Sequence, residues 1–268
     1  MEHFTKVEPG AQVRLDEIDP EFRGDLRKRD IEVAERIEAA REEMRALQER
    51  LYAECEQSLL IVLQAIDTGG KDGTIKHVMR GLNPAGVCVV GFKQPTPREL
   101  AHDFLWRIHP HTPAKGHIAV FNRSHYEDVL VVRVHNLVPE SVWRRRYDQI
   151  NEFERLLAEN GTRILKLFLC ISKDEQKERL QARLDNPDKH WKFAPGDLAE
   201  RERWVEYIEA FEEALTRCST EHAPWHIIPA NRKWFRNLTI AELVAGTLRE
   251  MDPQFPEPDF DPAEIVIK

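Results

Sequence analysis

Short apolar segments alternate along the chain with longer segments in which apolar residues recur every three or four positions. The apolar runs with strand character are SLLIVLQAI (58–66), GVCVVGF (86–92), HIAVF (117–121), TRILKLFLCI (162–171) and WHIIPA (225–230). Strands that are apolar throughout are typical of a parallel sheet that helices cover on both faces. The pattern therefore predicts an α/β fold, a three-layer α/β/α arrangement around a parallel five-stranded sheet.

The remaining segments predict a single domain over residues 1–268. A polar N-terminal arm leads into DIEVAERIEAAREEMRALQERLYAECE, which has the pattern of one long helix, so that arm and helix occupy about 1–57. The sequence contains no internal repeat and no interdomain linker, and we expect its Pro-rich tail from Asp252 to lie over the surface. A length of 268 residues suits one large domain of this class.

Composition excludes several classes of protein. The net charge of -8 argues against a general nucleic-acid binder, because such domains carry a surplus of Lys and Arg. The apolar runs are too short to span a membrane, and MEHFTKVEPG is not a signal peptide. The four cysteines lack the spacing of a zinc site or a disulfide framework, which favours the reducing cytoplasm. Basic WRRRY (143–147) lies on an expected helix and is interpreted as a solvated face.

The segment AIDTGGKDGT (65–74) follows the first apolar run and resembles a phosphate-binding loop. The regular pattern is GxxxxGKS or GxxxxGKT, of which only Gly70 and Lys71 match strictly, since Asp72 replaces the hydroxyl residue. The glycines let the backbone approach an anion, and the helix after the loop directs its N-terminus toward it. We expect contacts with phosphate from Lys71 and from Gly69, Gly70, Asp72, Gly73 and Thr74. The alternative is a charged turn.

A second carboxylate, Asp67, lies inside this loop. Phosphates would repel it unless a metal ion lay between them or the acceptor supplied a hydrogen-bond donor. Mg²⁺ prefers one or two carboxylates together with phosphate oxygens, so the loop predicts a magnesium site.

Polar residues also follow the third apolar run, in FNRSHYEDV (121–129). Asn122 stands where a Walker B acid would reach the metal, and Glu127 and Asp128 come five and six residues later. Arg123 is placed to neutralise charge on the transferred phosphoryl group, although a local carboxylate is an alternative partner for it.

The segment RLDNPDKHWKFAPGDL (183–198) has the composition of a mobile lid. It carries Arg183, Lys189 and Lys192 with two prolines and a glycine, and it would bring cations over a phosphate group. Trp191 favours a docked lid, spanning about 183–199, over a solvated loop.

The motifs DTGGKDGT, FNRSHYEDV and RLDNPDKHWKF together resemble the polyphosphate kinase 2 family, and FNRSHYED is similar to its class III subgroup. The resemblance implies a P-loop kinase fold with Mg²⁺, inorganic polyphosphate as phosphoryl donor, and nucleoside mono- and diphosphates as acceptors. By resemblance, the catalytic residues are Asp67, Lys71, Arg123 and Arg183, and the lid lysines bind polyphosphate. Many members have aspartate where this chain has Asn122, so Glu127 is expected to join Asp67 at the metal.

The sequence therefore predicts a reversible phosphotransferase that passes a phosphoryl group from polyphosphate to ADP or AMP, as a homo-oligomer. Nucleotide contacts are expected from Asn122, Glu127, Asp128 and Arg133. One alternative is a thymidylate-kinase-like enzyme that uses ATP, which the missing hydroxyl after Lys71 disfavours. A non-catalytic nucleotide-binding module is the other, and it would not need Arg123 and a cationic lid together.

Overall fold

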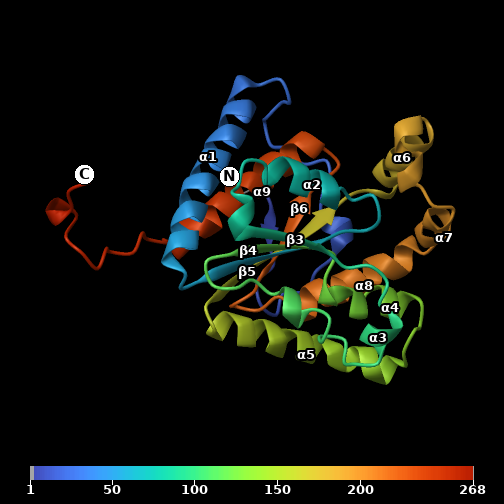
Figure 1. The fold of residues 1–268 in the computed structure, drawn as a ribbon. Helices are drawn as coiled ribbons and strands as arrows, with labels where there is room; N and C mark the ends of the chain where they lie inside the picture. Colours follow the sequence, from blue (N-terminus) through green and yellow to red (C-terminus); the bar gives the residue numbers. More distant parts are fainter. Residues whose placement is uncertain (1–2, 268) are drawn as a thin grey trace.

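The computed structural model describes residues 3–267 and contains a six-stranded sheet in the order β1-β6-β5-β2-β4-β3 (Figure 1). The strands are β1 Thr5–Lys6, β2 Ser58–Gln64, β3 Val87–Gly91, β4 Ile118–Asn122, β5 Thr162–Cys170 and β6 Trp225–Pro229. Strands β2 to β6 are parallel, which confirms the five predicted strands to within two residues at each end. The difference is β1, which pairs antiparallel with β6 and is too short to give a hydrophobic pattern.

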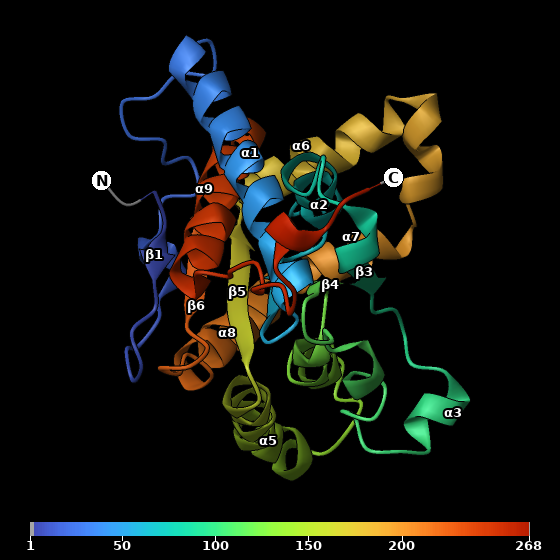
Figure 2. The ribbon, with the colours of Figure 1, turned by 60° about the vertical axis from the view of Figure 1, so that its left-hand side comes forward.

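Helices cover both faces of the sheet, as predicted (Figures 1 and 2). On one face lie α1 Ile31–Glu54, α2 Lys71–Val78 and α9 Lys233–Met251, and on the other lie α5 Glu140–Glu159 and α8 Trp204–Arg217. Alternate residues of β2 pack against the helices on the two opposite faces of the sheet. Leu59 and Ile61 pack in the α1 and α9 layer, whereas Leu60 and Val62 pack in the α5 and α8 layer. The strand is apolar throughout because both of its faces are buried.

The connections carry the shorter elements. These are α3 Pro97–Leu100, α4 Val131–Val134, α6 Lys173–Leu184, α7 Gly196–Glu202 and the 3-10 turns η4 His125–Asp128 and η5 Pro187–Lys192. Helices α6 and α7 project beyond the sheet at the end toward which β5 points (Figure 1). The tail does not follow the surface as predicted. After Pro253 its side chains are exposed, and Figure 1 shows it leading away from the body.

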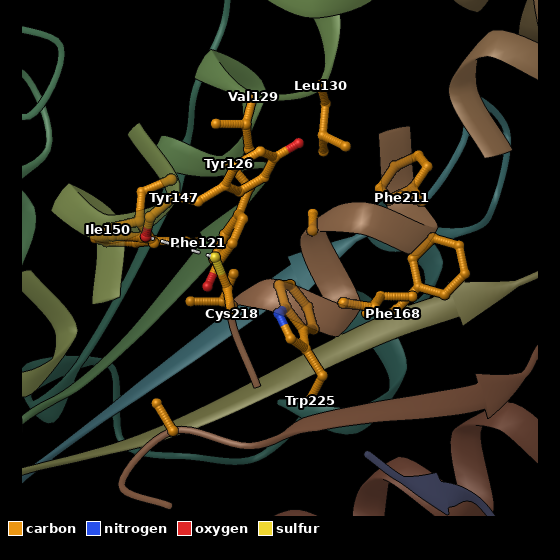
Figure 3. Packing of buried hydrophobic residues seen from close by; sticks show 14 of the residues in the cluster. Phe121, Tyr126, Val129, Leu130, Tyr147, Ile150, Phe168, Phe211, Cys218 and Trp225 are labelled. Carbon is orange, nitrogen blue, oxygen red and sulfur yellow. Dashed lines mark hydrogen bonds between the residues drawn. The ribbon is translucent and has the colours of Figure 1, made fainter. Parts of the chain in front are cut away.

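The layer under α5 and α8 is built around large aromatic side chains. Among the side chains drawn in Figure 3, Tyr126 and Trp225 pack edge to face with ring centroids 4.8 Å apart, and Phe168 packs against Phe211 at 4.7 Å. Lys166 of β5 enters this layer with its side chain fully buried, and it pairs with Glu154 of α5. Within residues 3–267, no helix combines the length and the apolar character that crossing a bilayer requires.

Candidate functional site

The two sequence motifs meet at the carboxyl ends of β2 and β4, where ligands collect in open α/β sheets. The strands pair with Leu63 opposite Asn122, and the amide of Arg123 donates to the carbonyl of Leu63 at 3.1 Å. The loop after β2 and the turn after β4 therefore leave the sheet side by side. Together with α6, η5 and the start of α9 they enclose a cavity of about 1520 Å³.

The loop after β2 takes a conformation that requires glycine at position 70. Gly70 precedes α2 with φ of 104°, and a Cβ there would collide with the Arg236 guanidinium and lie 3.3 Å from Nη1 of Arg179. Lys71 follows as the first residue of α2, buried, with Nζ donating to the carbonyl of Ala65 at 3.0 Å. Burial lowers the pKa of Lys71 to about 8.

The Arg123 guanidinium lies between the two carboxylates that were predicted to hold the metal. It forms ion pairs with Asp67 and, at 3.4 Å, with Glu127. Glu127 and Asp67 raise the pKa of Arg123, although burial opposes them. Arg123 also has φ of 63°, a left-handed conformation unusual for a side chain of this size, which turns the chain sharply from β4 into η4. The motif thus brings one cation and two carboxylates together.

Asn122 and Asp72 connect the turn after β4 to the first turn of α2 and to the lid. The amide of Asn122 donates to Oδ1 of Asp72 at 2.8 Å, and Nζ of Lys192 lies 3.5 Å from Oδ2 of the same carboxylate. Burial opposes the ionised form, but Asn122 and Lys192 hold the pKa of Asp72 below its ordinary value. The residue that replaces the usual hydroxyl therefore contacts two other residues with predicted site roles.

The remaining predicted residues divide between the cavity wall and the interior. Asp128 lines the cavity and pairs with Arg146 of α5 at 2.8 Å, while burial raises its pKa to about 6. Arg133 lies outside the wall. It pairs with Glu213 of α8 at 2.6 Å. Thr74 also lies behind the wall, where its hydroxyl donates to the Gly70 carbonyl at 3.2 Å.

The predicted lid comprises the end of α6, η5 and α7, and it places three cations on the cavity wall. Arg183 donates to the carbonyl of Lys192 at 3.0 Å, and Lys189 and Lys192 come from η5. Trp191 does not dock. Its side chain is 78% exposed, and the Nζ of Lys192 lies 4.9 Å from the ring centroid. The tryptophan therefore gives no evidence for closure in this conformation.

Sequence reasoning missed two arginines beside the loop, Arg179 of α6 and Arg236 of α9. Every N–H group of Arg179 is engaged, with acceptors on the Glu175 carboxylate and the carbonyls of Thr68, Gly69, Ala230 and Asn231. This arginine fastens the loop after β2 to the end of β6. The spacing of Arg179 and Arg183, one helical turn apart, was the signal available in the sequence.

Charge and polarity are distributed unevenly over the wall. It carries twelve lysines and arginines but only four carboxylates, although the protein is acidic as a whole. Apolar side chains gather beyond β3 and around α4, namely Phe92, Ile108, Val131, Leu137 and Val138. The cavity can therefore bind a highly charged anion and an apolar ring in different parts.

The carboxylates at the site could bind a divalent ion only together with oxygens of a bound phosphate. Residues 3–267 contain no group of three or more His, Cys, Asp or Glu side chains placed to hold a metal. The carboxylates of Asp67 and Glu127 both reach Arg123, and Mg²⁺ is commonly bound by one or two carboxylates with substrate oxygens and water. The residues present fit an ion that arrives with its substrate.

Comparison with known proteins agrees with this geometry. Residues 27–256 match the family described as Polyphosphate kinase 2. An AMP/ADP-polyphosphate phosphotransferase of Meiothermus ruber is 50% identical over 263 residues, 98% of each chain. An ADP-polyphosphate phosphotransferase of Rhodopseudomonas palustris is 44% identical over 81% of this chain and 79% of that protein. The crystal structure of Polyphosphate Kinase 2 from Arthrobacter aurescens TC1 superposes with a TM-score of 0.91, at 42% identity over 98% of this chain and 97% of that one. The resemblance drawn from three motifs is confirmed, and the chain belongs to the polyphosphate kinase 2 family.

Proposed function

We propose that the protein transfers a phosphoryl group from inorganic polyphosphate to ADP and AMP. The observation that carries this proposal is the charge of the cavity wall, which contains twelve basic and four acidic residues around a phosphate-binding loop. Such an excess suits a donor that is itself a long polyanion. The names of the relatives in Meiothermus and Rhodopseudomonas, which specify AMP and ADP or ADP alone as acceptors, support the same reaction.

The reaction exchanges one phosphoanhydride for another. An oxygen of the acceptor's terminal phosphate forms a bond to the terminal phosphorus of the polyphosphate. The bond from that phosphorus to the rest of the donor breaks, and the shortened polyphosphate leaves with the electron pair. Because bonds of the same kind are made and broken, the transfer is reversible and asks mainly for positioning and charge stabilisation.

The residues at the loop and the turn would meet different parts of this transition state. Lys71 and the backbone of Gly69 and Gly70 would hold donor phosphate oxygens, and Arg123 would stabilise charge on the transferred group. In the described conformation Arg123 is paired with Asp67 and Glu127, so binding of phosphate would exchange one set of anionic partners for another.

A divalent ion, which we propose to be Mg²⁺, would be held by Asp67 and Glu127. Once bound, such an ion would supply positive charge that lets carboxylates and phosphates share a small volume. The basic residues of the lid, Arg183, Lys189 and Lys192, would then enclose the donor. The apolar wall around Phe92 and Val131 is the part suited to the acceptor's base.

The decisive experiment is a phosphotransfer assay on the purified protein with Mg²⁺. We expect ATP to form from ADP and long-chain polyphosphate without any supply of ATP, and ADP to form from AMP. Efficient phosphorylation of a monophosphate by ATP, with polyphosphate inert, would instead favour a thymidylate-kinase-like enzyme. No transfer from either donor would favour a nucleotide-binding module.

Cytoplasmic location and homo-oligomeric assembly stay predictions. Size-exclusion chromatography with light scattering tests the second of them.

A further inference from the structure

Arg236 is a buried cation without a counter-charge. It comes from the first turns of α9, is 2% exposed, and yet lines the cavity. Among residues 3–267 its guanidinium forms no ion pair. Its acceptor is Oδ1 of the neighbouring Asn237, 2.8 Å from Nη2 and 3.2 Å from Nε. The third nitrogen, Nη1, lies against Gly70 and has no protein acceptor in the part of the chain described.

Arg179 and Lys233 are the cations near this guanidinium. The guanidinium groups of Arg179 and Arg236 both lie against Gly70, and Lys233, one helical turn before Arg236, lies on the same wall with Lys76 of α2. Burial and the charge of Arg179 lower the pKa of Arg236 to about 10, and the same two causes, in that order, lower the pKa of Lys233. A buried charge is normally paired, so the unpaired Arg236 costs the free protein stability that a bound anion would restore.

The strand order places this cluster on a definite side of the loop. Strands β5 and β6 lie on one side of β2, and α9 follows β6, whereas β4 and β3 lie on the other side. Asn122, Arg123 and Glu127 follow β4, and the apolar wall begins beyond β3 with Phe92. The cationic cluster and the apolar wall are therefore separated by the phosphate-binding loop.

We propose that Arg236, with Lys233 and Lys76, binds phosphate units of the polyphosphate donor that lie beyond the transferred one. The donor then enters from the α9 side and presents its end to Lys71, while the acceptor approaches from the β3 and β4 side. This inference rests on the proposed function for the identity of the donor and the acceptor. The contact between Arg236 and polyphosphate can be tested by binding measurements without any phosphoryl transfer.

The test compares Arg236→Met with Arg232→Gln as a matched control. Arg232 lies four residues earlier, is exposed, is paired with Glu21 at 2.7 Å, and is not on the cavity wall. For Arg236→Met we expect the KM for long-chain polyphosphate to rise about tenfold or more, with the KM for ADP within about twofold, because charge-assisted contacts to the donor are lost. The slope of log affinity for polyphosphate against log salt concentration should become less steep, by about the amount that one ionic contact contributes.

Thermal unfolding supplies a readout that does not depend on turnover. Without ligand, Arg236→Met should be as stable as the wild type or more stable, because an unpaired buried charge is removed. Long-chain polyphosphate should raise the melting temperature of Arg236→Met less than it raises that of the wild type. With tripolyphosphate, the difference between the two increases in melting temperature should be smaller. Lys233→Ala, at an exposed position, should weaken polyphosphate binding by a smaller factor without affecting the fold.

Two results would overturn the proposal. One is equal stabilisation by polyphosphate in the wild type and Arg236→Met. The other, should Arg236→Met fail to fold, is unchanged polyphosphate affinity in Lys233→Ala. If the wild type binds polyphosphate but transfers nothing to ADP, the proposed function fails while these binding measurements still decide on the subsite.

Discussion

Replacing Lys166 by Met should strongly destabilise the protein. Its Nζ lies 2.6 Å from Oε2 of Glu154 and 2.8 Å from the hydroxyl of Tyr126, and it also donates to the carbonyl of Cys218. Glu154 accepts from the same tyrosine hydroxyl at 2.8 Å and contacts His125 at 3.2 Å. Both members of the Lys166–Glu154 pair are fully buried.

The size of the effect follows from the charge that is left behind. Removing one partner of a buried ion pair costs about 3 to 5 kcal/mol, because the other stays buried without compensation. For a chain of this length each kcal/mol lowers the melting temperature by about 2 °C, which gives a fall of about 6 to 10 °C. In the double variant Lys166→Met/Glu154→Gln, no bare carboxylate remains and the amide oxygen can still accept. We therefore expect it to regain at least half of the loss.

Circular dichroism during heating, at pH 5 and pH 8, is the measurement, with Lys177→Met at an exposed position as control. In the wild type, Lys166 and His125 hold the pKa of Glu154 below its ordinary value against the effect of burial, so this contribution fades only as the pH falls below about 4.5. In Lys166→Met the charge of the lysine is lost and burial is opposed only by the contacts from Tyr126 and His125. The pKa of Glu154 therefore rises above its wild-type value, and the deficit should be smaller at pH 5 than at pH 8. Equal losses in the single and double variants would refute the reasoning.

Four further outcomes are expected at the site. Asp67→Asn should lower turnover by about 10²-fold or more and raise the Mg²⁺ requirement, with a melting temperature close to the wild type; normal Mg²⁺ titration curves would contradict this. Lys71→Met should abolish ATP formation from polyphosphate, yet stabilise the free protein by up to about 3 kcal/mol below pH 8, since the wild-type lysine has a pKa of about 8. That gain should disappear between about pH 8 and 10.5, as the folded wild type loses the proton that the unfolded chain retains; urea unfolding at both limits measures it. Lys192→Ala should weaken polyphosphate binding and flatten its salt dependence by about one contact, and an unchanged slope would remove this lysine from the donor site. Arg133→Gln should lower stability without changing the KM for ADP, and a raised KM would return this residue to the nucleotide site.

The four inner parallel strands, β2, β4, β5 and β6, could be predicted because burial on both faces leaves a direct mark on the sequence, and the edge strand β3 is also apolar although its residues are exposed or half-buried. Each parallel strand is a run of apolar residues, and its ends follow from the polar or glycine residues around it. Strand β1 has no such mark, since two residues paired at an edge are exposed on both faces. The buried ion pair of Lys166 could not be predicted either, although this residue lies in a long apolar strand. A single lysine within an apolar strand looks like an exception, and only the approach of Glu154 from α5 shows why it is tolerated.

The candidate site was predictable as far as its residues lie in compact motifs. Asp67 and Lys71 belong to one motif, and Arg123 and Glu127 to another, and each motif directly follows an apolar run, where a parallel sheet places its ligand site. Arg236 belongs to a helix more than 100 residues later in the chain, and its position against Gly70 depends on how β6 lies in the sheet. Arg133 is close to the second motif in the sequence, but its side chain pairs with Glu213, so its contact with the nucleotide stays a prediction.

The uneven charge of the cavity wall also shapes how a substrate arrives. Once the wall has taken its twelve basic and four acidic residues, 27 basic and 43 acidic residues are left for the rest of the chain. A diffusing polyanion is therefore repelled over most of the exterior and attracted at one opening, where field lines from the wall are focused. Added salt shortens the range of both effects to about 8 Å at physiological strength, so this guidance acts only during the last steps of an encounter. Other polyanions of the cell that are too wide for the opening, duplex nucleic acids among them, would meet only the repulsive part of this field.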